Sequence, residues 1–506
     1  MTHWIKYFTL LLLISFSCVV QAKHKKTHHL AHSSPPQKTH SQKISLQKNI
    51  IGSQALGTEI NHILQSVNER TSISIAIKSM DHGEMLYTKN EQELLTPAST
   101  MKIMTAEAAL LYLGSDYQFT TALLTDTVNI NNGIVNGNIY LVLNGDPTLT
   151  YTDLIHLMDA LNQQHIQEIV GNVYIDTTAF DQANYGPGWE WDDKRNCFAA
   201  PINASIINHN CLSLQMTPGT KIGQIANIIP SSQYYYATIN NNVITKRAHT
   251  HSCFIQLGMD ENNSISLSGC MPKGKYAWGF STTISNVAAY NKALIQSLLQ
   301  HFNILIKGYV STGTASTHLS NIASHQSEPL STLVKNMLKM SDNIIASSLF
   351  KKLGEYYTQQ PGSWENGSLA VKSILKNKAA VNTDGLQIID GSGLSRDNKI
   401  QAMQLLQVLD YAYHDPSTHN EFISSLPIAS VDGTLKHRLY NVKNKVHAKT
   451  GTMQGVTSLA GYVIDKNNET IAFAIIVNTH KENIWHYREI EDKIVTVLAN
   501  YSRDSS

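Results

Sequence analysis

Two apolar runs, in TSLAGYVIDKNNETIAFAIIVN (residues 457–478), flank the turn residues Asp465–Asn468 near the C-terminus. This pattern is typical of two strands joined by a tight turn. Toward the N-terminus, SISIAIKSMDHGEMLYTKN (72–90) alternates apolar and polar residues on both sides of a DHG turn, which indicates a hairpin. Helices are expected between these ends, in segments such as 329–354 and 401–413. Strands at both ends with helices between them predict one α+β domain whose central sheet is closed by the two ends of the chain.

The chain is long enough for two or three domains. It has 506 residues, and 42% of them are hydrophobic, which is ample for packed cores. The formal net charge of +1 argues against a dedicated nucleic-acid-binding protein. Between residues 119 and 319, short strand-like runs such as GNIYLVLNGD and GNVYIDTT alternate with Gly, Asn and Pro turns. We interpret this stretch as an insertion into the α+β domain.

The first residues have the pattern of an export signal. Lys6 precedes the apolar stretch Phe8–Val20, and VVQA then places small residues at a cleavage position. We predict a signal peptide at 1–22, followed by a basic, His-rich, disordered leader at 23–48. A transmembrane anchor is disfavoured because the apolar stretch is short for a bilayer span. After signal cleavage we expect an exported chain with no membrane span.

Four cysteines remain after removal of the signal: Cys197, Cys211, Cys253 and Cys270. An even number of cysteines in an exported protein predicts disulfide bonds. Three connectivities are possible, and proximity in sequence favours the two local pairs, Cys197–Cys211 and Cys253–Cys270. No C-x-x-C spacing supports a zinc cluster, so no metal and no cofactor are expected.

A serine and a lysine lie three positions apart at the start of an apolar helical run in TPASTMKIMTAEAALLYLG (96–114). Residues at this spacing share one helix face, so the Lys102 amine can reach the Ser99 hydroxyl. Spacing alone does not identify a catalytic pair, because S-x-x-K also occurs at Ser45/Lys48, Ser348/Lys351 and Ser373/Lys376. The surroundings of Ser99 favour catalysis: a helix N-terminus stabilises negative charge on oxygen, and apolar neighbours of Lys102 favour a desolvated amine with a lowered pKa.

Two further short motifs can complete such a site. MSDNIIA places polar side chains within an apolar helical run, where they are costly unless they serve a purpose; these are Ser341, Asp342 and Asn343. HAKTGTMQG lies just before or at the start of the C-terminal strands, where a lysine and two hydroxyls can bind a carboxylate. Its residues are Lys449, Thr450, Gly451 and Thr452.

The order S-x-x-K, S-D-N and K-T-G resembles that of the serine penicillin-recognising enzymes. The long gap between Lys102 and Ser341 is similar to that of the class C low-molecular-mass penicillin-binding proteins, which are D-alanyl-D-alanine carboxypeptidases and endopeptidases. The same family is indicated by NGDPTL (144–149), GPGWEWDD (186–193), DGSGLSR (390–396) and LPIASVDGTL (426–435). Class A β-lactamases fit less well, because they keep S-x-x-K and S-D-N close in sequence. The resemblance covers nearly all of the chain after the leader.

The resemblance implies an α+β architecture of the β-lactamase/transpeptidase type, with an antiparallel sheet flanked by helices. The catalytic domain would consist of two parts, 49–118 and 320–506. A domain inserted at 119–319 would interrupt it and would carry a nested third domain near 200–277. The family's paired cysteines fall at Cys197/Cys211 and Cys253/Cys270, which supports the local disulfide pairing.

The resemblance also implies roles for the motif residues. Ser99 would be the nucleophile, Lys102 its general base, and Ser341 a proton relay to the leaving group. Asn343 would bind the substrate's peptide chain, and Lys449 would supply positive potential. The K-T-G strand would bind the terminal carboxylate through Thr450 and Thr452, with Gly451 between them, and the backbone N–H groups of Ser99 and Thr452 would form an oxyanion hole. Residues implied at the entry to the site are Asp193, Arg396 and Gln454. Trp189 and Trp191 are expected to pack rather than to bind sugar.

The implied substrates are peptidoglycan stem peptides, cleaved between two D-alanines through an acyl-enzyme, with β-lactam antibiotics as covalent inhibitors. The implied location is the periplasm, soluble or peripherally attached to the membrane. Two alternatives stay open at this point: a serine β-lactamase, and a peptidoglycan-binding scaffold without turnover. A metallopeptidase is disfavoured because the sequence contains no H-E-x-x-H motif.

Overall fold

The computed structural model describes residues 53–503, except positions 129, 231–236, 249, 251–252, 275–276 and 481–482. The predicted signal peptide at 1–22 and the predicted leader at 23–48 lie outside the described residues. Within the described part of the chain, no helix combines the length and apolar character needed to cross a membrane.

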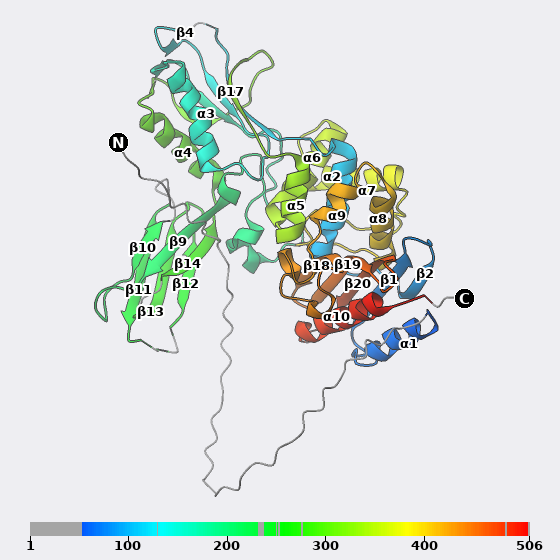
Figure 1. The fold of residues 1–506 in the computed structure, drawn as a ribbon. Coiled ribbons are helices and arrows are strands. Elements are labelled where there is room, and N and C mark those ends of the chain that lie inside the picture. The colour runs from blue at the N-terminus through cyan, green and yellow to red at the C-terminus, as the bar shows by residue number, and fades with distance from the viewer. Residues whose placement is uncertain are drawn as a thin grey trace, which may run out of the picture. The chain divides into compact units, whose positions relative to one another are not determined.

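One antiparallel sheet joins segments from the two ends of the described chain (Figure 1), in the order β18-β19-β20-β1-β2. Its strands are β1 (Ser72–Ser79), β2 (Met85–Lys89), β18 (Val446–Met453), β19 (Val456–Ile464) and β20 (Thr470–Asn478). The β19–β20 turn is held by the Asp465 carboxylate, which accepts the backbone N–H groups of Asn467 and Glu469 at 2.7 and 2.8 Å. Strand β1 pairs with β20 from Ser72 opposite Asn478 to Ser79 opposite Ile471. The predicted α+β class, with a sheet closed by the chain ends, is confirmed.

Helices cover both faces of this sheet. Figure 1 shows α1 (Ser53–Leu64) and α10 (Ile484–Asn500) together below it. The opposite face carries α2 (Met101–Leu113), α5 (Leu330–Met340), α6 (Asn343–Thr358), α7 (Trp364–Ala379), α8 (Ala402–His414) and α9 (His419–Ser425). Successive strand side chains point to opposite faces. Accordingly, Ile475 of β20 belongs to the core with α1 and α10, whereas its neighbours Ala474 and Ile476 belong to the core with α2 and α8.

The helix expected at 329–354 is two helices, and this prediction was wrong. Helix α5 ends at Met340 and α6 begins at Asn343. Ser341 between them adopts a left-handed conformation with φ 60°, which is incompatible with a continuous helix. The Asp342 carboxylate caps α6 by accepting the backbone N–H groups of Ile344 and Ile345 at 2.8 and 3.0 Å. Apolar periodicity continues through the break and therefore does not reveal it.

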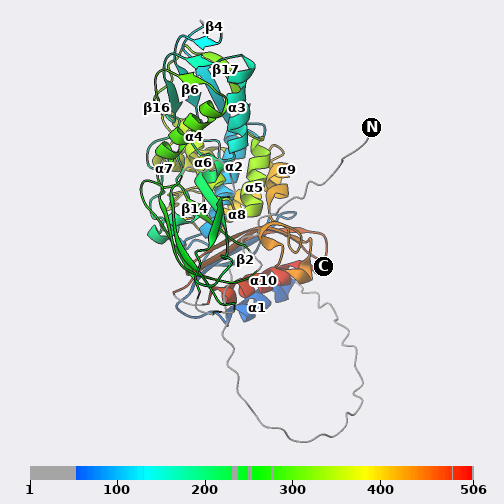
Figure 2. The same cartoon turned by 90° about the vertical axis from the view of Figure 1, so that its left-hand side faces the viewer.

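The middle of the chain forms further sheets packed on two helices, α3 (Tyr151–Gln163) and α4 (Val287–His301), as seen in Figure 2. One sheet has the order β16-β8-β6-β3-β17, with β3 (Thr120–Thr125), β6 (Ile139–Val142), β8 (Val173–Asp176), β16 (Val310–Thr312) and β17 (Ser320–Gln326). A smaller sheet, β15-β7-β5-β4, contains β4 (Ile130–Asn131), β5 (Ile134–Val135), β7 (Glu168–Ile169) and β15 (Leu305–Ile306). Because β17 pairs with β3, the larger sheet extends past the predicted boundary at 319.

Six more strands form two three-stranded sheets, which pack with α3 and α4 around a shared core. The sheet β10-β9-β14 contains β9 (Cys211–Thr217), β10 (Asn227–Pro230) and β14 (Trp278–Thr283). The sheet β11-β13-β12 contains β11 (Ile239–Lys246), β12 (Ile255–Met259) and β13 (Ile265–Pro272). Disulfides join Cys197 to Cys211 and Cys253 to Cys270 across Cα–Cα distances of 5.5 and 5.0 Å. The structure therefore has the local pairing expected from the sequence.

Candidate active site

Ser99 lies in a short 3-10 turn, Ala98–Thr100, that leads directly into α2. The turn is anchored at the Pro97 carbonyl, which accepts the hydroxyls of Thr100 and Ser458 at 2.8 and 2.6 Å. Strand β18 lies close beside it: a Cβ added at Gly451 would be 3.0 Å from the Ser99 backbone nitrogen. The nucleophile candidate is therefore fixed against the edge of the central sheet.

Lys102 is completely buried and reaches Ser99 as its spacing predicts. Its Nζ lies 3.0 Å from Ser99 Oγ, 2.6 Å from Asn343 Oδ1 and 2.6 Å from the Ser392 carbonyl oxygen. Burial lowers the pKa of Lys102 from its ordinary value of 10.5 to about 7, and the negative charges of Asp390 and Asp342 oppose the shift. An amine with this pKa is half deprotonated near neutral pH, and a neutral amine can accept the proton of the serine hydroxyl.

The Ser392 carbonyl is held in place by a buried carboxylate that the sequence analysis did not single out. Asp390 accepts the indole N–H of Trp189 at 2.7 Å, the Ser392 hydroxyl at 2.9 Å and the Gly393 backbone N–H at 2.8 Å. Trp189 is buried, as expected, but Trp191 is 78% exposed, so the prediction that Trp191 packs in the protein was wrong. Trp191 lies on the 3-10 turn Trp191–Arg195, which buries none of its residues.

The break between α5 and α6 directs two polar side chains to different partners. The left-handed Ser341 places its hydroxyl 2.9 Å from Lys449 Nζ. Asn343 accepts the Lys102 amine through Oδ1 and donates through Nδ2 to the Phe198 carbonyl at 2.9 Å. The S-D-N motif thus contacts both lysines of the site, through Ser341 on one and Asn343 on the other.

The K-T-G motif lies within β18, next to the Ser99 turn. Lys449 is fully buried, and its Nζ also donates to the Thr450 carbonyl at 2.7 Å. Burial, and secondarily the charge of Lys102, lowers the pKa of Lys449 well below its ordinary value. The two amines therefore disfavour each other's protonation.

A cavity of about 230 Å³ opens beside these groups. Its lining consists of Ser99, Ser341, Thr434, Arg438, Thr450, Thr452 and Arg488. Arg488 of α10 donates to the Thr452 hydroxyl at 2.5 Å, and Arg438 pairs with Glu491 and Asp492 at 3.0 and 2.7 Å. The cavity thus has hydroxyls on one wall and guanidinium groups nearby, which suits a carboxylate.

Sequence reasoning missed Arg488, Arg438 and Thr434. No motif marked the two arginines, and only the return of α10 along the sheet brings Arg488 to β18. Thr434 lies within the quoted LPIASVDGTL segment, and its hydroxyl accepts from Thr450 at 2.7 Å. That segment was assigned to the family without a role for any single residue.

The three residues expected at the entry do not line this cavity. Arg396 forms an ion pair with Glu190 and donates to the Gln454 carbonyl at 3.0 Å, so it connects two loops. Burial raises the pKa of Asp193, and the negative charge of Glu190 raises it further. The positive charge of Arg396 opposes this increase in the pKa. Among the described residues, no cluster of three or more His, Cys, Asp or Glu side chains is arranged to hold a metal ion.

Comparison with known proteins identifies the family. Residues 56–501 match the D-Ala-D-Ala carboxypeptidase 3 (S13) family. The D-alanyl-D-alanine carboxypeptidase DacB of Haemophilus influenzae is 33% identical over 425 residues, which cover 83% of this chain and 88% of that protein. The D-alanyl-D-alanine carboxypeptidase of Actinomadura sp. strain R39 is 30% identical over 464 residues, covering 88% and 85% of the two chains.

A solved structure extends the comparison to three dimensions. Penicillin binding protein 4 (dacB) from Haemophilus influenzae superposes with a TM-score of 0.78 at 31% identity, covering 87% of this chain and 99% of that one. The same protein complexed with a β-lactam gives a TM-score of 0.75 at 30% identity. Together with the arrangement of its three motifs, these matches establish that the chain belongs to the D-Ala-D-Ala carboxypeptidase 3 (S13) family of penicillin-binding serine carboxypeptidases.

Proposed function

We propose that Ser99 cleaves the peptide bond between two D-alanines at the end of a peptidoglycan stem peptide, by way of an acyl-enzyme. The observation that carries the proposal is the pairing of the Ser99 hydroxyl with a fully buried amine, Lys102 Nζ, at 3.0 Å. A buried amine whose pKa is about 7 is suited to act as a general base at neutral pH.

In the acylation step, Ser99 Oγ attacks the carbonyl carbon of the penultimate D-alanine while its proton passes to Lys102 Nζ. The negative charge that develops on the carbonyl oxygen is stabilised by the backbone N–H groups of Ser99 and Thr452. The close packing of Gly451 on the Ser99 turn supports this assignment, because it brings the two backbone segments together. Removal of one such donor costs roughly 3–4 kcal/mol in other serine hydrolases.

Breakdown of the tetrahedral intermediate requires a proton for the departing D-alanine amine. We assign the relay to Ser341, whose hydroxyl lies 2.9 Å from the Lys449 amine: the hydroxyl gives its proton to the departing amine and takes one from the Lys449 ammonium. The proton that Lys102 took from Ser99 then restores the starting charge of the two lysines. The C–N bond then breaks, free D-alanine leaves, and water later hydrolyses the ester on Ser99. In a β-lactam the leaving amine stays tethered to the acyl group, so the corresponding ester persists.

The terminal carboxylate of the substrate is assigned to the K-T-G side of the cavity. The hydroxyls of Thr450 and Thr452 and the charge of Lys449 supply donors there, and Arg488 adds a guanidinium bonded to Thr452. Asn343 is assigned to the peptide chain of the substrate. Asp193, Arg396 and Gln454 are assigned to the rim, where they contact parts of the stem peptide remote from the bond that breaks.

We infer an exported, periplasmic location from the predicted signal peptide and from the pairing of all four cysteines outside that segment. The division into a catalytic part, 49–118 with 327–506, and an inserted part, 119–326, belongs to the same proposal. The boundary moves from 319 because β17 pairs with β3 of the inserted part. Peptidoglycan is the polymer that such a location and family imply as substrate.

The test combines covalent labelling with product analysis. The mature protein is incubated with penicillin, the mass of the adduct is measured, and the labelled peptide is mapped; the label is expected on Ser99 and is expected to disappear in Ser99→Ala. In parallel, release of D-alanine from a peptide ending in D-Ala-D-Ala is measured. A label that persists at the same site in Ser99→Ala overturns the assignment. Rapid loss of the penicilloyl group indicates a β-lactamase instead, and peptide binding without D-alanine release indicates a scaffold.

A further inference from the structure

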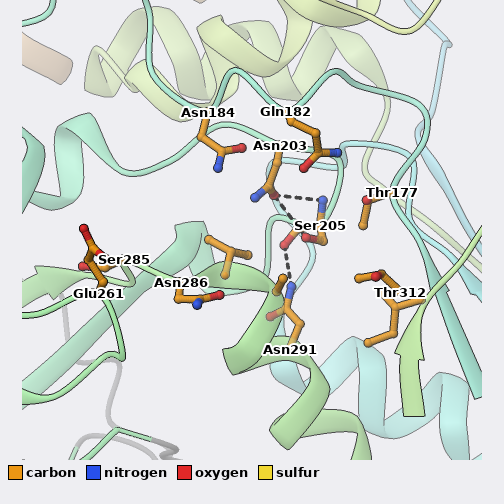
Figure 3. Close-up of a pocket in the computed structure, with 13 residues that line it drawn as sticks. Thr177, Gln182, Asn184, Asn203, Ser205, Glu261, Ser285, Asn286, Asn291 and Thr312 are labelled. Carbon is orange, nitrogen blue, oxygen red and sulfur yellow. Dashed lines mark hydrogen bonds between the residues drawn. The ribbon is translucent and has the colours of Figure 1, made fainter. Parts of the chain in front are cut away.

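A second cavity, of about 270 Å³, lies where the ends of β8 and β16 meet the N-terminus of α4 (Figure 3). It shares no lining residue with the cavity at Ser99. Its size is slightly below the range of about 300–1,000 Å³ typical of small-ligand sites, which limits an occupant to a small group.

Carboxamide side chains are the most frequent polar groups in the lining of this cavity. Figure 3 shows Gln182, Asn184 and Asn203 on one side and Asn291 on the opposite side. Asn203 is oriented by Ser205, whose backbone N–H and hydroxyl donate to its Oδ1 at 3.0 and 3.1 Å. The cavity is therefore polar, and its wall on the Asn203 side is preorganised by local hydrogen bonds.

Two amide oxygens in the lining have no hydrogen-bond partner among the described residues: Asn184 Oδ1 and Asn291 Oδ1. Asn291 is only 1% exposed, and its Nδ2 donates to the Ser205 carbonyl at 3.0 Å, which fixes the amide so that the oxygen is the unsatisfied atom. A buried acceptor without a donor is costly and requires an explanation. A ligand that brings N–H or O–H groups into the cavity would satisfy both oxygens.

The charge of the lining restricts the class of ligand. Among the described residues that line it, Glu261 is the only acidic or basic one, and Glu261 is exposed. The remaining polar lining consists of neutral amides and hydroxyls. These groups do not match the charge of an anion or of a multiply charged ligand. Neutral groups that combine hydroxyls with an amide, as in an N-acetylamino sugar, offer a donor for each unsatisfied oxygen and acceptors for the Asn and Gln amide nitrogens.

We propose that this cavity is a binding site for one N-acetylamino sugar unit. The proposal of a sugar site rests on the cavity and on its two unsatisfied amide oxygens. Its use during catalysis, to hold the glycan that carries the stem peptide, rests on the proposed function. A sugar held there would anchor the polymer at a second point and raise the effective concentration of the stem peptide at Ser99.

The experiment titrates the full mature protein with N-acetylglucosamine and with its β-1,4-linked dimer, using saturation-transfer NMR. Asn184→Ala is the main variant, because it removes an unsatisfied oxygen and leaves the partners of Asn291 and Asn203 in place. It is expected to weaken sugar binding about two- to tenfold, the effect of losing one hydrogen bond. Asn291→Ala is the second variant, with a larger expected loss. Asn242→Ala is the matched control, because it changes an exposed asparagine on β11 outside the cavity.

The outcomes separate the sugar site from the hydrolase. Absence of saturable sugar binding, or equal affinity in Asn184→Ala and wild type, overturns the proposal. Binding of an ammonium compound that is lost in Glu261→Gln and at high salt, with no sugar binding, overturns it in favour of a cation site. Sugar binding is expected to persist in Ser99→Ala, and penicillin labelling is expected to persist in Asn184→Ala. Failure of labelling in the wild type therefore overturns the proposed function alone.

Discussion

The rate at which a β-lactam acylates the protein is expected to rise with pH through about 7, because only the neutral form of Lys102 can accept the Ser99 proton. The depression of the Lys102 pKa from 10.5 to about 7 corresponds to a cost of about 5 kcal/mol for charging this amine in its buried position. With a pKa of 7, the neutral fraction rises about tenfold between pH 6 and pH 8. An amine with the ordinary pKa would be almost entirely charged over this range.

Asp342→Asn is the perturbation that isolates this effect. Asn is as good an N-cap as Asp, so α6 keeps its start, but the variant removes a negative charge that raises the Lys102 pKa. The midpoint of the profile should therefore move to lower pH. A shift of about half a unit would raise the rate at pH 6 about two- to threefold and leave the rate at pH 8 nearly unchanged.

The assay is stopped-flow acylation with a chromogenic β-lactam from pH 5.5 to 9, at substrate concentrations low enough to report kcat/KM for acylation. Asp384→Asn is the matched control, because Asp384 is exposed and is not among the groups that shift the pKa of Lys102. The midpoint of the pH–rate profile reports the coupled titration of Lys102 and Lys449 rather than that of either lysine alone. A rate that is flat across this range, a midpoint above 9, or a shift to higher pH in Asp342→Asn would refute the assignment of Lys102 as the base.

Three further predictions test other parts of the structure. Arg488→Ala should lower the acylation rate about ten- to hundredfold for a β-lactam that carries its carboxylate, because a hydrogen bond to a charged group is worth about 1.5–3 kcal/mol. The loss should be much smaller for the corresponding β-lactam ester. Equal losses for acid and ester would exclude a carboxylate-binding role for Arg488. Gly393→Ala should abolish acylation, because the added Cβ would overlap the Ala98 carbonyl beside Ser99. Gly83 is also at positive φ but has open space around it, so Gly83→Ala should lose only stability. Equal acylation rates in the two variants would contradict the steric effect expected at Gly393. Replacing Cys197 and Cys211 by Ser should lower the free energy of unfolding by about 3 kcal/mol relative to the wild-type protein, as expected for a 14-residue separation. Urea titration of the two proteins measures the difference, and an unchanged midpoint would show that this disulfide is not needed for stability.

The two hairpins and helix α2 could be predicted because local sequence specifies them. Alternation in 72–90 and the Asp465 turn between two apolar runs are signals that act over a few residues. The contact of Lys102 with Ser99 follows from their spacing of three, because the 3-10 turn that holds Ser99 leads directly into α2. For the same reason the α+β class could be predicted from the sequence alone.

The break at Ser341 could not be predicted from periodicity, because α5 and α6 are both apolar on their buried faces. The residue that breaks the helix is a serine in the left-handed conformation rather than a glycine or a proline. Its conformation is stabilised by contacts far away in sequence, above all the bond from Lys449 on β18 to the Ser341 hydroxyl. Arg488 was missed for a related reason, since only the packing of α10 on the central sheet brings it to Thr452.

The coupling of the two buried lysines predicts that substrate binding changes which of them carries a proton. Each amine is buried, and the charge of Lys102 lowers the pKa of Lys449, so a proton on one disfavours a proton on the other. A substrate carboxylate bound at the proposed position on Thr450 and Thr452 would add negative charge beside the K-T-G strand, where Lys449 bonds to the Thr450 carbonyl. Binding should then favour the proton on Lys449 and leave Lys102 neutral. The same carboxylate that positions the scissile bond would thereby help to keep Lys102 neutral, so that it can accept the Ser99 proton when Ser99 attacks that bond.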